Sequence, residues 1–193
     1  MSRRDAWRER TYVSVDLETT TADPRRAEPL SVGWVRVREG RVRCGEAGYT
    51  LVRHAGEVPA AWLRVHGLLP EHLDGGAEPD AVAERLRAAL GDDGVLLAHG
   101  AGLEQAVLRR LGVRPAAVVD TLAVVRRLDE RAGRAGADPR LPAAARRWGV
   151  PALPAHHAYR DALTTALLLL ALAGSVEQQR GRCEARDLEL LSR

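Results

Sequence analysis

The chain is predicted to fold as one α/β domain in which helices flank a mixed β-sheet. Its 193 residues suffice for a single domain with a hydrophobic core. The N-terminal part shows the alternating hydrophobicity of antiparallel strands, and the C-terminal part alternates helical patterns with short apolar runs. Strands first, and then helices and strands in turn, are typical of a mixed sheet covered by helices.

The first strand is predicted over residues 11–17 because its side chains alternate with a period of two. One face carries Val13, Val15 and Leu17, and the other carries Ser14, Asp16 and Glu18. The second face is therefore expected to carry function or to meet solvent. Residues 29–52 then predict two more strands, joined by a turn at Glu39-Gly40.

The remaining elements follow from helical spacing and from short apolar runs. In order they are a helix over 79–91, a strand over 94–100, a helix over 101–112, a strand over 116–120, a helix from Thr121 with Asp120 as its N-cap, a short helix over 140–150 and a long helix over 156–174. Residues 130–140 have the composition of a flexible loop.

Three segments are predicted: an N-terminal extension (1–10), the domain itself (11–174) and a polar C-terminal tail (175–193). The start of the chain is charged and lacks an apolar signal segment, and Cys44 and Cys183 form no metal-binding or disulfide pattern. A cytoplasmic location is therefore expected. The apolar run 162–174 is too short to span a membrane, so it is interpreted as a core helix, and no membrane contact is expected.

Arginine supplies every basic side chain counted as Lys or Arg, and the formal net charge is +3. This charge permits nucleic-acid binding without requiring it. Paired arginines recur at 3–4, 25–26, 109–110, 126–127 and 146–147. They fit phosphate-contacting edges as well as ordinary helix exteriors, and we favour the second interpretation.

Asp16 and Glu18 lie two residues apart on the first strand, so their carboxylates point the same way. Hard oxygen ligands of this kind are preferred by Mg²⁺ and Mn²⁺. Taken alone, the pair also fits the solvent-facing end of a strand. Further acids shift the balance, because Glu104 lies in the first turn of a helix and Asp161 begins the last one, five residues after His156.

At these residues the chain resembles the DEDDh branch of the DnaQ-like 3′-5′ exonucleases, which includes the proofreading epsilon subunit of bacterial DNA polymerase III, ribonuclease T and oligoribonuclease. The motifs that carry the resemblance are "VDLETT", "LLAHGAGLEQAVL" and "HHAYRDALTTA", the last matching H-x-A-x-x-D-A. Smaller similarities are "VHGL" and "VVDTLAVVRRL". The resemblance runs from about residue 12 to 172.

The resemblance implies an RNase H-like fold with a mixed five-stranded sheet and a site for two Mg²⁺ or Mn²⁺ ions. Carried over residue by residue, it makes four acids the metal ligands and His156 the general base; the acids are Asp16, Glu18, Glu104 and Asp161. His157 is the alternative base, but the motif spacing favours His156. Leu17, Thr19, His66, His99 and Leu103 are implied to bind substrate, although a buried strand position for Leu17 and a structural role for His66 are equally compatible.

The second motif departs from the usual H-N-x-x-F-D pattern, with Gly100, Leu103 and Glu104 in place of Asn, Phe and Asp. The side chain of Glu104 is longer than that of Asp by one bond of about 1.5 Å. A small shift of the helix would absorb this difference, and otherwise activity would fall. We expect a working site.

The function expected is release of nucleoside 5′-monophosphates from single-stranded DNA or RNA 3′ ends, with DNA slightly favoured. The alternatives are an RNA-trimming enzyme similar to oligoribonuclease and a nucleic-acid-binding module weakened at Glu104. A DNA polymerase acting in trans is a candidate partner, and both a monomer and a homodimer are compatible with the sequence.

Overall fold

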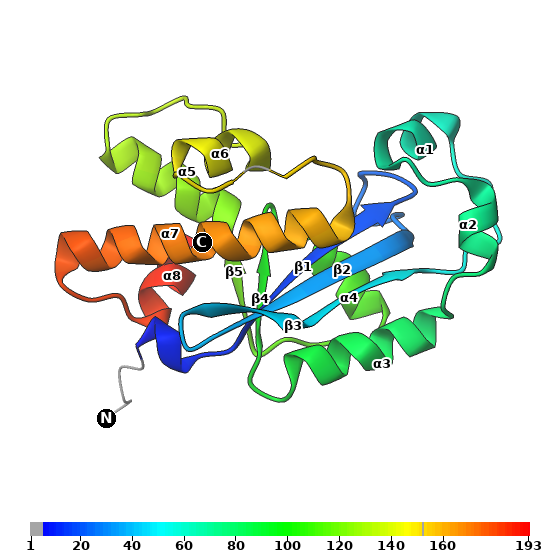
Figure 1. Ribbon diagram of the computed structural model, residues 1–193, viewed down its shortest axis with the longest axis horizontal. Helices are drawn as coiled ribbons and strands as arrows, with labels where there is room; N and C mark the ends of the chain where they lie inside the picture. The colour runs from blue at the N-terminus through cyan, green and yellow to red at the C-terminus, as the bar shows by residue number, and fades with distance from the viewer. Residues whose placement is uncertain (1–5, 152) are drawn as a thin grey trace.

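The computed structural model describes residues 6–151 and 153–193, which surround a five-stranded mixed sheet (Figure 1). Its strands are β1 (Tyr12–Thr19), β2 (Pro29–Arg38), β3 (Arg41–Leu51), β4 (Val95–Ala98) and β5 (Ala117–Asp120). They lie in the order β3-β2-β1-β4-β5, in which β2 pairs antiparallel with both β1 and β3, while the β1–β4 and β4–β5 pairs are parallel. The predicted five-stranded mixed sheet is confirmed.

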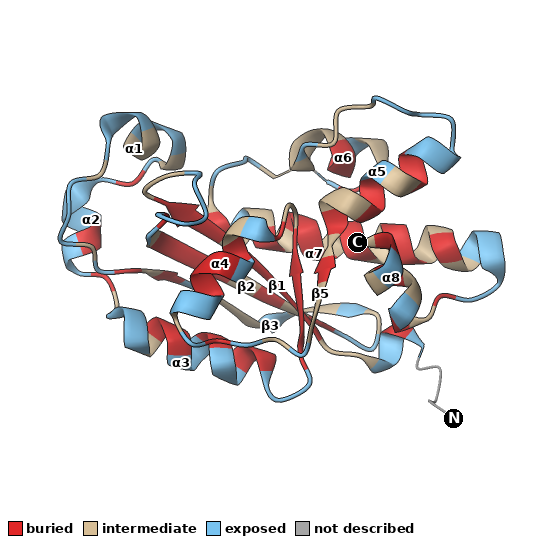
Figure 2. Ribbon diagram, turned by 180° about the vertical axis from the view of Figure 1, so that it is seen from behind, coloured by how far each residue is buried: buried red, intermediate tan, exposed pale blue. Residues whose placement is uncertain are grey.

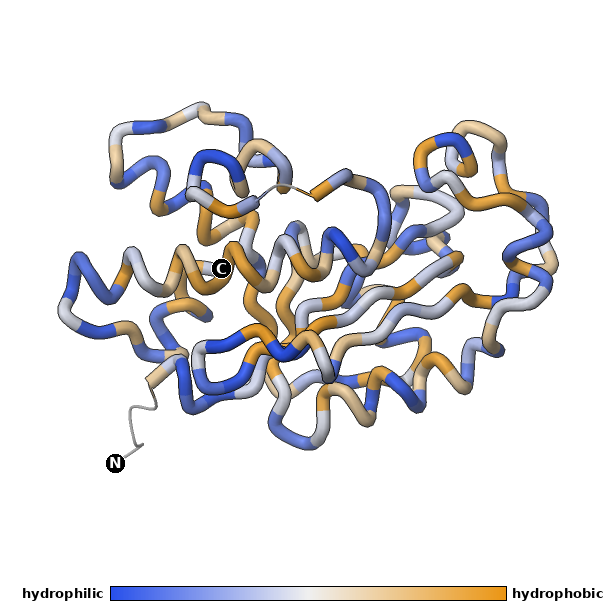
Figure 3. Tube along the Cα trace, in the orientation of Figure 1, coloured by the Kyte–Doolittle hydropathy of each residue, from blue (hydrophilic) through white to orange (hydrophobic). Residues whose placement is uncertain are grey.

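Helices cover both faces of this sheet. They are the 3-10 helix η1 (Trp7–Glu9) and the α-helices α1 (Ala60–His66), α2 (Pro70–Asp74), α3 (Pro79–Leu90), α4 (Gly102–Arg110), α5 (Thr121–Arg131), α6 (Leu141–Arg147), α7 (Ala158–Arg180) and α8 (Ala185–Leu191). One hydrophobic cluster lies between the sheet and α5 to α8, and a second lies on the face covered by α3 and α4. In Figure 3 hydrophobic and hydrophilic residues alternate along α3, whose buried positions include the predicted Val82, Leu86 and Leu90.

The polar face of β1 does not meet solvent, contrary to one of the two sequence expectations. Ser14 is fully buried, and the strand appears almost entirely in the colour of buried residues in Figure 2. Val13, Val15 and Leu17 pack against α3 and α4, while α7 crosses the opposite face. Since both faces are covered, Glu18 is buried and Asp16 is only partly exposed.

The turn predicted at Glu39-Gly40 is confirmed by the pairing of Arg38 with Arg41. Both turn residues have positive φ, 55° for Glu39 and 66° for Gly40. Two-residue hairpin turns prefer this conformation because its twist matches that of the flanking strands.

Helices α1 and α2 were not predicted. They span only 7 and 5 residues, and α1 buries none of its residues, so neither shows the apolar spacing by which an amphipathic helix is recognised. Helix α1 is held beside the end of β1 by the contacts of His66 described below, and α2 packs its Leu73 in a small cluster with Leu30 of β2.

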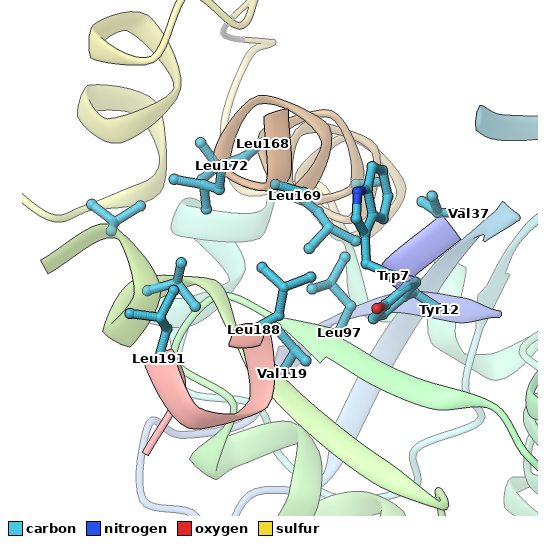
Figure 4. Packing of buried hydrophobic residues seen from close by; sticks show 14 of the residues in the cluster. Trp7, Tyr12, Val37, Leu97, Val119, Leu168, Leu169, Leu172, Leu188 and Leu191 are labelled. Atoms are coloured by element: carbon cyan, nitrogen blue, oxygen red, sulfur yellow. The ribbon is translucent and has the colours of Figure 1, made fainter. Parts of the chain in front are cut away.

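The described parts of both terminal segments pack onto the domain. The predicted boundary at residue 174 falls within α7, which continues to Arg180, and α8 follows. Figure 4 shows Leu188 and Leu191 of the tail and Trp7 of the extension in the same hydrophobic cluster as Leu168. The described parts of the predicted extension and tail thus bury side chains in the core of the domain. Residues 1–5, including the Arg3-Arg4 pair, lie outside the described part.

Helix α7 is 23 residues long and apolar enough, by length and composition, to cross a membrane. Half of its most apolar window is buried inside the protein, however, and its Leu168, Leu169 and Leu172 belong to the main hydrophobic cluster. The prediction of a core helix is confirmed.

Candidate active site

Helix α7 packs closely on the sheet at Gly33 of β2, which lies beside β1. In the sheet Gly33 pairs with Asp16, and a Cβ atom placed on Gly33 would come within 2.3 Å of the backbone of Ala158 and Tyr159. The absence of a side chain therefore lets the first turn of α7 rest directly on the sheet. That turn carries Asp161, so the close contact brings Asp161 near Asp16.

Three of the four predicted acids converge on one point. Ligand oxygens of Asp16, Glu18 and Asp161 all lie within 4.8 Å of one another. Burial raises the pKa of Asp16 well above its ordinary range, and the charges of Glu104, Asp161 and Glu18 raise it further. The carboxylates thus repel one another in a poorly solvated place, an arrangement that a bound cation would relieve.

Glu104 lies beside this group but is not within the 4.8 Å set. It is buried at the start of α4, and its Oε2 has no hydrogen-bond partner. Burial raises the pKa of Glu104 to about 8, with the charges of Asp120 and Glu18 adding to the effect. An unpartnered carboxylate oxygen next to three converging acids fits a fourth ligand position.

The turn before α7 is organised by Asp161. Its Oδ2 accepts a hydrogen bond from the backbone N–H of His156 at 2.8 Å, and a longer one from that of His157 at 3.4 Å. His156 adopts a positive φ of 64°, a conformation that non-glycine residues rarely take. The side chain of His156 is exposed beside Asp16 and Asp161 in the cleft described below.

His157 points elsewhere. Its ring stacks on Tyr49 of β3, with centroids 4.7 Å apart and an angle of 28° between the planes. Its Nδ1 atom is buried without a hydrogen-bond partner. Of the two neighbouring histidines, His156 is the one that lines the cleft beside Asp16 and Asp161.

The side chain of His66 contacts Glu18 and does not line the cleft described below. Its Nδ1 forms an ion pair with Glu18, its Nε2 lies 3.1 Å from the carbonyl oxygen of Thr19, and its ring stacks on Trp62. Burial alone lowers the pKa of His66, but the contacts with Glu18 and Thr19 raise it overall. The ion pair with Glu18 and the contact with Thr19 tie α1 to the end of β1. Helix α1 thereby fixes Glu18.

His99 joins three segments at the end of β4. Its Nδ1 lies 2.9 Å from Thr121 Oγ1 and its Nε2 lies 2.8 Å from the carbonyl oxygen of Pro139. Burial lowers the pKa of His99, although the hydrogen bond to Pro139 opposes the shift. With both ring nitrogens engaged, His99 supports the second motif and anchors the 130–140 loop.

Asp120 has a wider role than the N-cap that the sequence predicted. Its carboxylate accepts from the backbone N–H of Leu122, which confirms the cap, and also from Gly100 at 2.8 Å and Ala101 at 3.0 Å. One side chain therefore fixes the start of α5 and the turn that leads to Glu104. Residues 100 and 120 are close because β4 pairs with β5, and no local sequence pattern predicts this contact.

The other predicted substrate residues are engaged in packing. Leu17 is buried against α3 and α4, Leu103 packs partly buried on the same cluster, and the Thr19 hydroxyl donates to the carbonyl oxygen of Thr21 at 2.9 Å. Leu17, Thr19, His66 and Leu103 are not among the described residues that line the cleft. The alternative roles for Leu17 and His66, a buried strand position and a structural contact, agree with these contacts.

A cleft of about 700 Å³ opens over the acids. Asp16, Ala155, His156 and Asp161 line it, together with His99 and residues of α5, α6 and the loop before α6. Arg126, Arg140 and Arg146 contribute positive charge to this wall. The cleft therefore joins a potential cation site to a basic surface, which is a suitable environment for a phosphate ester.

A family model described as Exonuclease (RNase_T) matches residues 13–169, which include all of the predicted acids and His156. The chain belongs to the Exonuclease family. Its motifs group it with the DEDD-type 3′-5′ exonucleases, with Glu104 standing where that pattern has Asp. No curated protein matches the chain.

Solved structures of exonucleases share this fold. Exonuclease I from E. coli in complex with a dT13 oligonucleotide is 17% identical with a TM-score of 0.72, over 88% of this chain and 42% of that one. Exonuclease X in complex with 5′ overhanging duplex DNA is 19% identical with a TM-score of 0.73, over 94% of this chain and 99% of that one. The exonuclease domain thus spans about two fifths of the exonuclease I chain, and the RNase H-like, DnaQ-like fold is confirmed.

Proposed function

We propose that this protein is a two-metal 3′-5′ exonuclease that releases nucleoside 5′-monophosphates from nucleic-acid ends, with DNA slightly favoured. The observation that carries the proposal is the convergence of Asp16, Glu18 and Asp161 at a cleft that Asp16 and Asp161 line together with His156. The exonuclease I and exonuclease X structures contain DNA, which supports the preference.

The three converging acids would hold Mg²⁺ or Mn²⁺, with Glu104 as the fourth ligand. When bound, two such ions supply charge neutralisation and a more acidic attacking water. His156 takes the proton of that water, a role suited to an imidazole near neutral pH. Asp161 keeps His156 at the site through the hydrogen bond to its backbone.

A second candidate is a nucleic-acid-binding module with weak or absent cleavage. The position of Glu104 outside the closely converging set favours it, because a displaced fourth ligand lowers the rate of phosphoryl transfer. An RNA-trimming enzyme differs from the main proposal only in substrate.

The test is degradation of 5′-labelled single-stranded DNA and RNA in Mg²⁺ and in Mn²⁺, with Asp16→Ala, Glu104→Asp and the control Asp93→Ala. Asp93 is exposed in the turn before β4, at the opposite end of the sheet. Stepwise shortening that only Asp16→Ala abolishes supports the exonuclease. Cleavage by Glu104→Asp but not by the native protein supports the binding module.

A further inference from the structure

In two of the arginine pairs, the two members have different roles. In α5, Arg127 donates a hydrogen bond to the carbonyl oxygen of Leu190 in α8, whereas Arg126 lines the cleft. In α6, Arg147 binds the carboxylate of Asp129 at 2.6 Å, whereas Arg146 lines the cleft. In each of these two pairs one arginine fixes the fold and the other faces the cleft.

The two cleft arginines are held on a rigid wall. Asp129 of α5 is buried and binds Arg147 of α6 together with Arg134, which ties the two helices together. A buried and fully paired carboxylate of this kind tolerates little movement. Arg126 and Arg146 are therefore presented by a fixed pair of helices and not by a mobile loop.

Their charges are available to a ligand. Arg140, the third basic residue of the wall, is bound by Asp138 through contacts of 2.7 to 3.1 Å. Within residues 6–151 and 153–193, neither Arg126 nor Arg146 forms an ion pair. Both are exposed, and the charge of Arg126 helps to lower the pKa of His99 on the same wall.

The chemistry of the reaction identifies what these guanidinium groups would meet. In a 3′-5′ cleavage, the phosphate of the terminal nucleotide is the scissile one and lies at the acids. Every other phosphate of the strand belongs to nucleotides on the 5′ side. Guanidinium groups bind phosphate oxygens with good geometry, and backbone contacts of this kind position a strand without reading its sequence.

We infer that Arg126 and Arg146 bind phosphates of the strand on the 5′ side of the scissile bond, in DNA or RNA, and so set the affinity for longer substrates. This inference rests on the proposed function of the site. The two residues are positioning residues, because they act on the strand and not on the reacting atoms.

The test compares the double variant Arg126→Gln/Arg146→Gln with the native protein and with Arg114→Gln. Arg114 is exposed in the loop before β5, at the opposite end of that strand from Asp120. Two substrates are used: thymidine 5′-monophosphate p-nitrophenyl ester, which has no phosphate on the 5′ side, and single-stranded DNA and RNA oligonucleotides. Binding of the labelled oligonucleotides in Ca²⁺ is measured as a function of salt.

The double variant is expected to lose far more kcat/KM on oligonucleotides than on the nitrophenyl ester, chiefly through KM. For binding, log K decreases as log salt increases, and this negative slope should become less steep by about 0.7 for each arginine removed from a single-strand contact. Equal losses on both substrates, or an unchanged salt slope, would overturn the inference.

Failure of the proposed function has a different signature. In that case the native protein cleaves neither substrate, but the double variant still binds oligonucleotides less tightly than the native protein does. This result would refute the nuclease function and would support the phosphate contacts. Equal losses in DNA and RNA assign the contacts to the shared phosphodiester backbone, and a loss confined to one of them contradicts that assignment.

Discussion

Asp161 binds the backbone N–H of His156 at 2.8 Å with the same carboxylate that lies within 4.8 Å of Asp16 and Glu18. One residue therefore belongs to the proposed cation site and also fixes the residue proposed as general base. The positive φ of His156 shows that this turn depends on its surroundings. The two roles of Asp161 are separable by substitution.

Asp161→Asn is expected to abolish most activity while retaining the turn, since the amide oxygen still accepts from the His156 N–H. Asp161→Ala loses both roles. The alanine variant should be less stable than the asparagine variant by about 1 kcal/mol, the usual worth of a hydrogen bond. Urea denaturation in EDTA measures the difference, and equal stabilities would show that the hydrogen bond does not hold the turn.

Gly33→Ala is expected to displace the start of α7, because its Cβ would lie 2.3 Å from backbone atoms of Ala158 and Tyr159. A shift on the ångström scale costs roughly 10²-fold in rate, and overpacking costs about 1–3 kcal/mol of stability. Gly45→Ala on β3 is the matched control, since nothing lies within 4 Å of the added atom. Activity and denaturation curves are compared, and a fully active Gly33→Ala protein would contradict the close packing.

The metal-free protein is expected to lose stability as the pH rises. A carboxyl group whose pKa is higher in the folded than in the unfolded state binds its proton more tightly when folded. For Glu104 the pKa rises from 4.5 to about 8, so stability should fall between these values, and Asp16 acts in the same direction. Melting temperatures in EDTA across this range provide the measurement.

Glu104→Gln removes the charge and should flatten this pH dependence, raising the melting temperature above that of the native protein at pH values above about 8. Glu130→Gln, at an exposed position in α5, is the control. A native melting temperature that is constant over the same range would refute the burial of an ionisable Glu104.

Mg²⁺ or Mn²⁺ is expected to raise the melting temperature, because either ion binds the folded state and relieves repulsion among the acids. At about 100 times its dissociation constant, a ligand stabilises by roughly 2.7 kcal/mol. Calcium serves as a comparison, and Asp16→Asn should lose most of the shift. No shift at millimolar metal would count against the cation site.

The sequence by itself determined the order of the five strands and of helices α3 to α7, the turn at Glu39-Gly40, the cap at Asp120 and the choice of the four candidate acids. These features are local, because side-chain periodicity, turn chemistry and motif spacing act over a few residues. The predicted ends were less accurate. Helix α7 continues to Arg180 because Val176 finds a place in the hydrophobic cluster, which no local signal records.

Only the tertiary structure decided how the site is assembled. The contact of Gly33 with α7, the ion pair of His66 with Glu18 and the stack of His157 on Tyr49 join residues far apart in the chain. The division of the arginine pairs into structural and cleft-facing members has the same origin. Such contacts depend on how the elements pack, and each involves residue types that fit several roles equally well in the sequence.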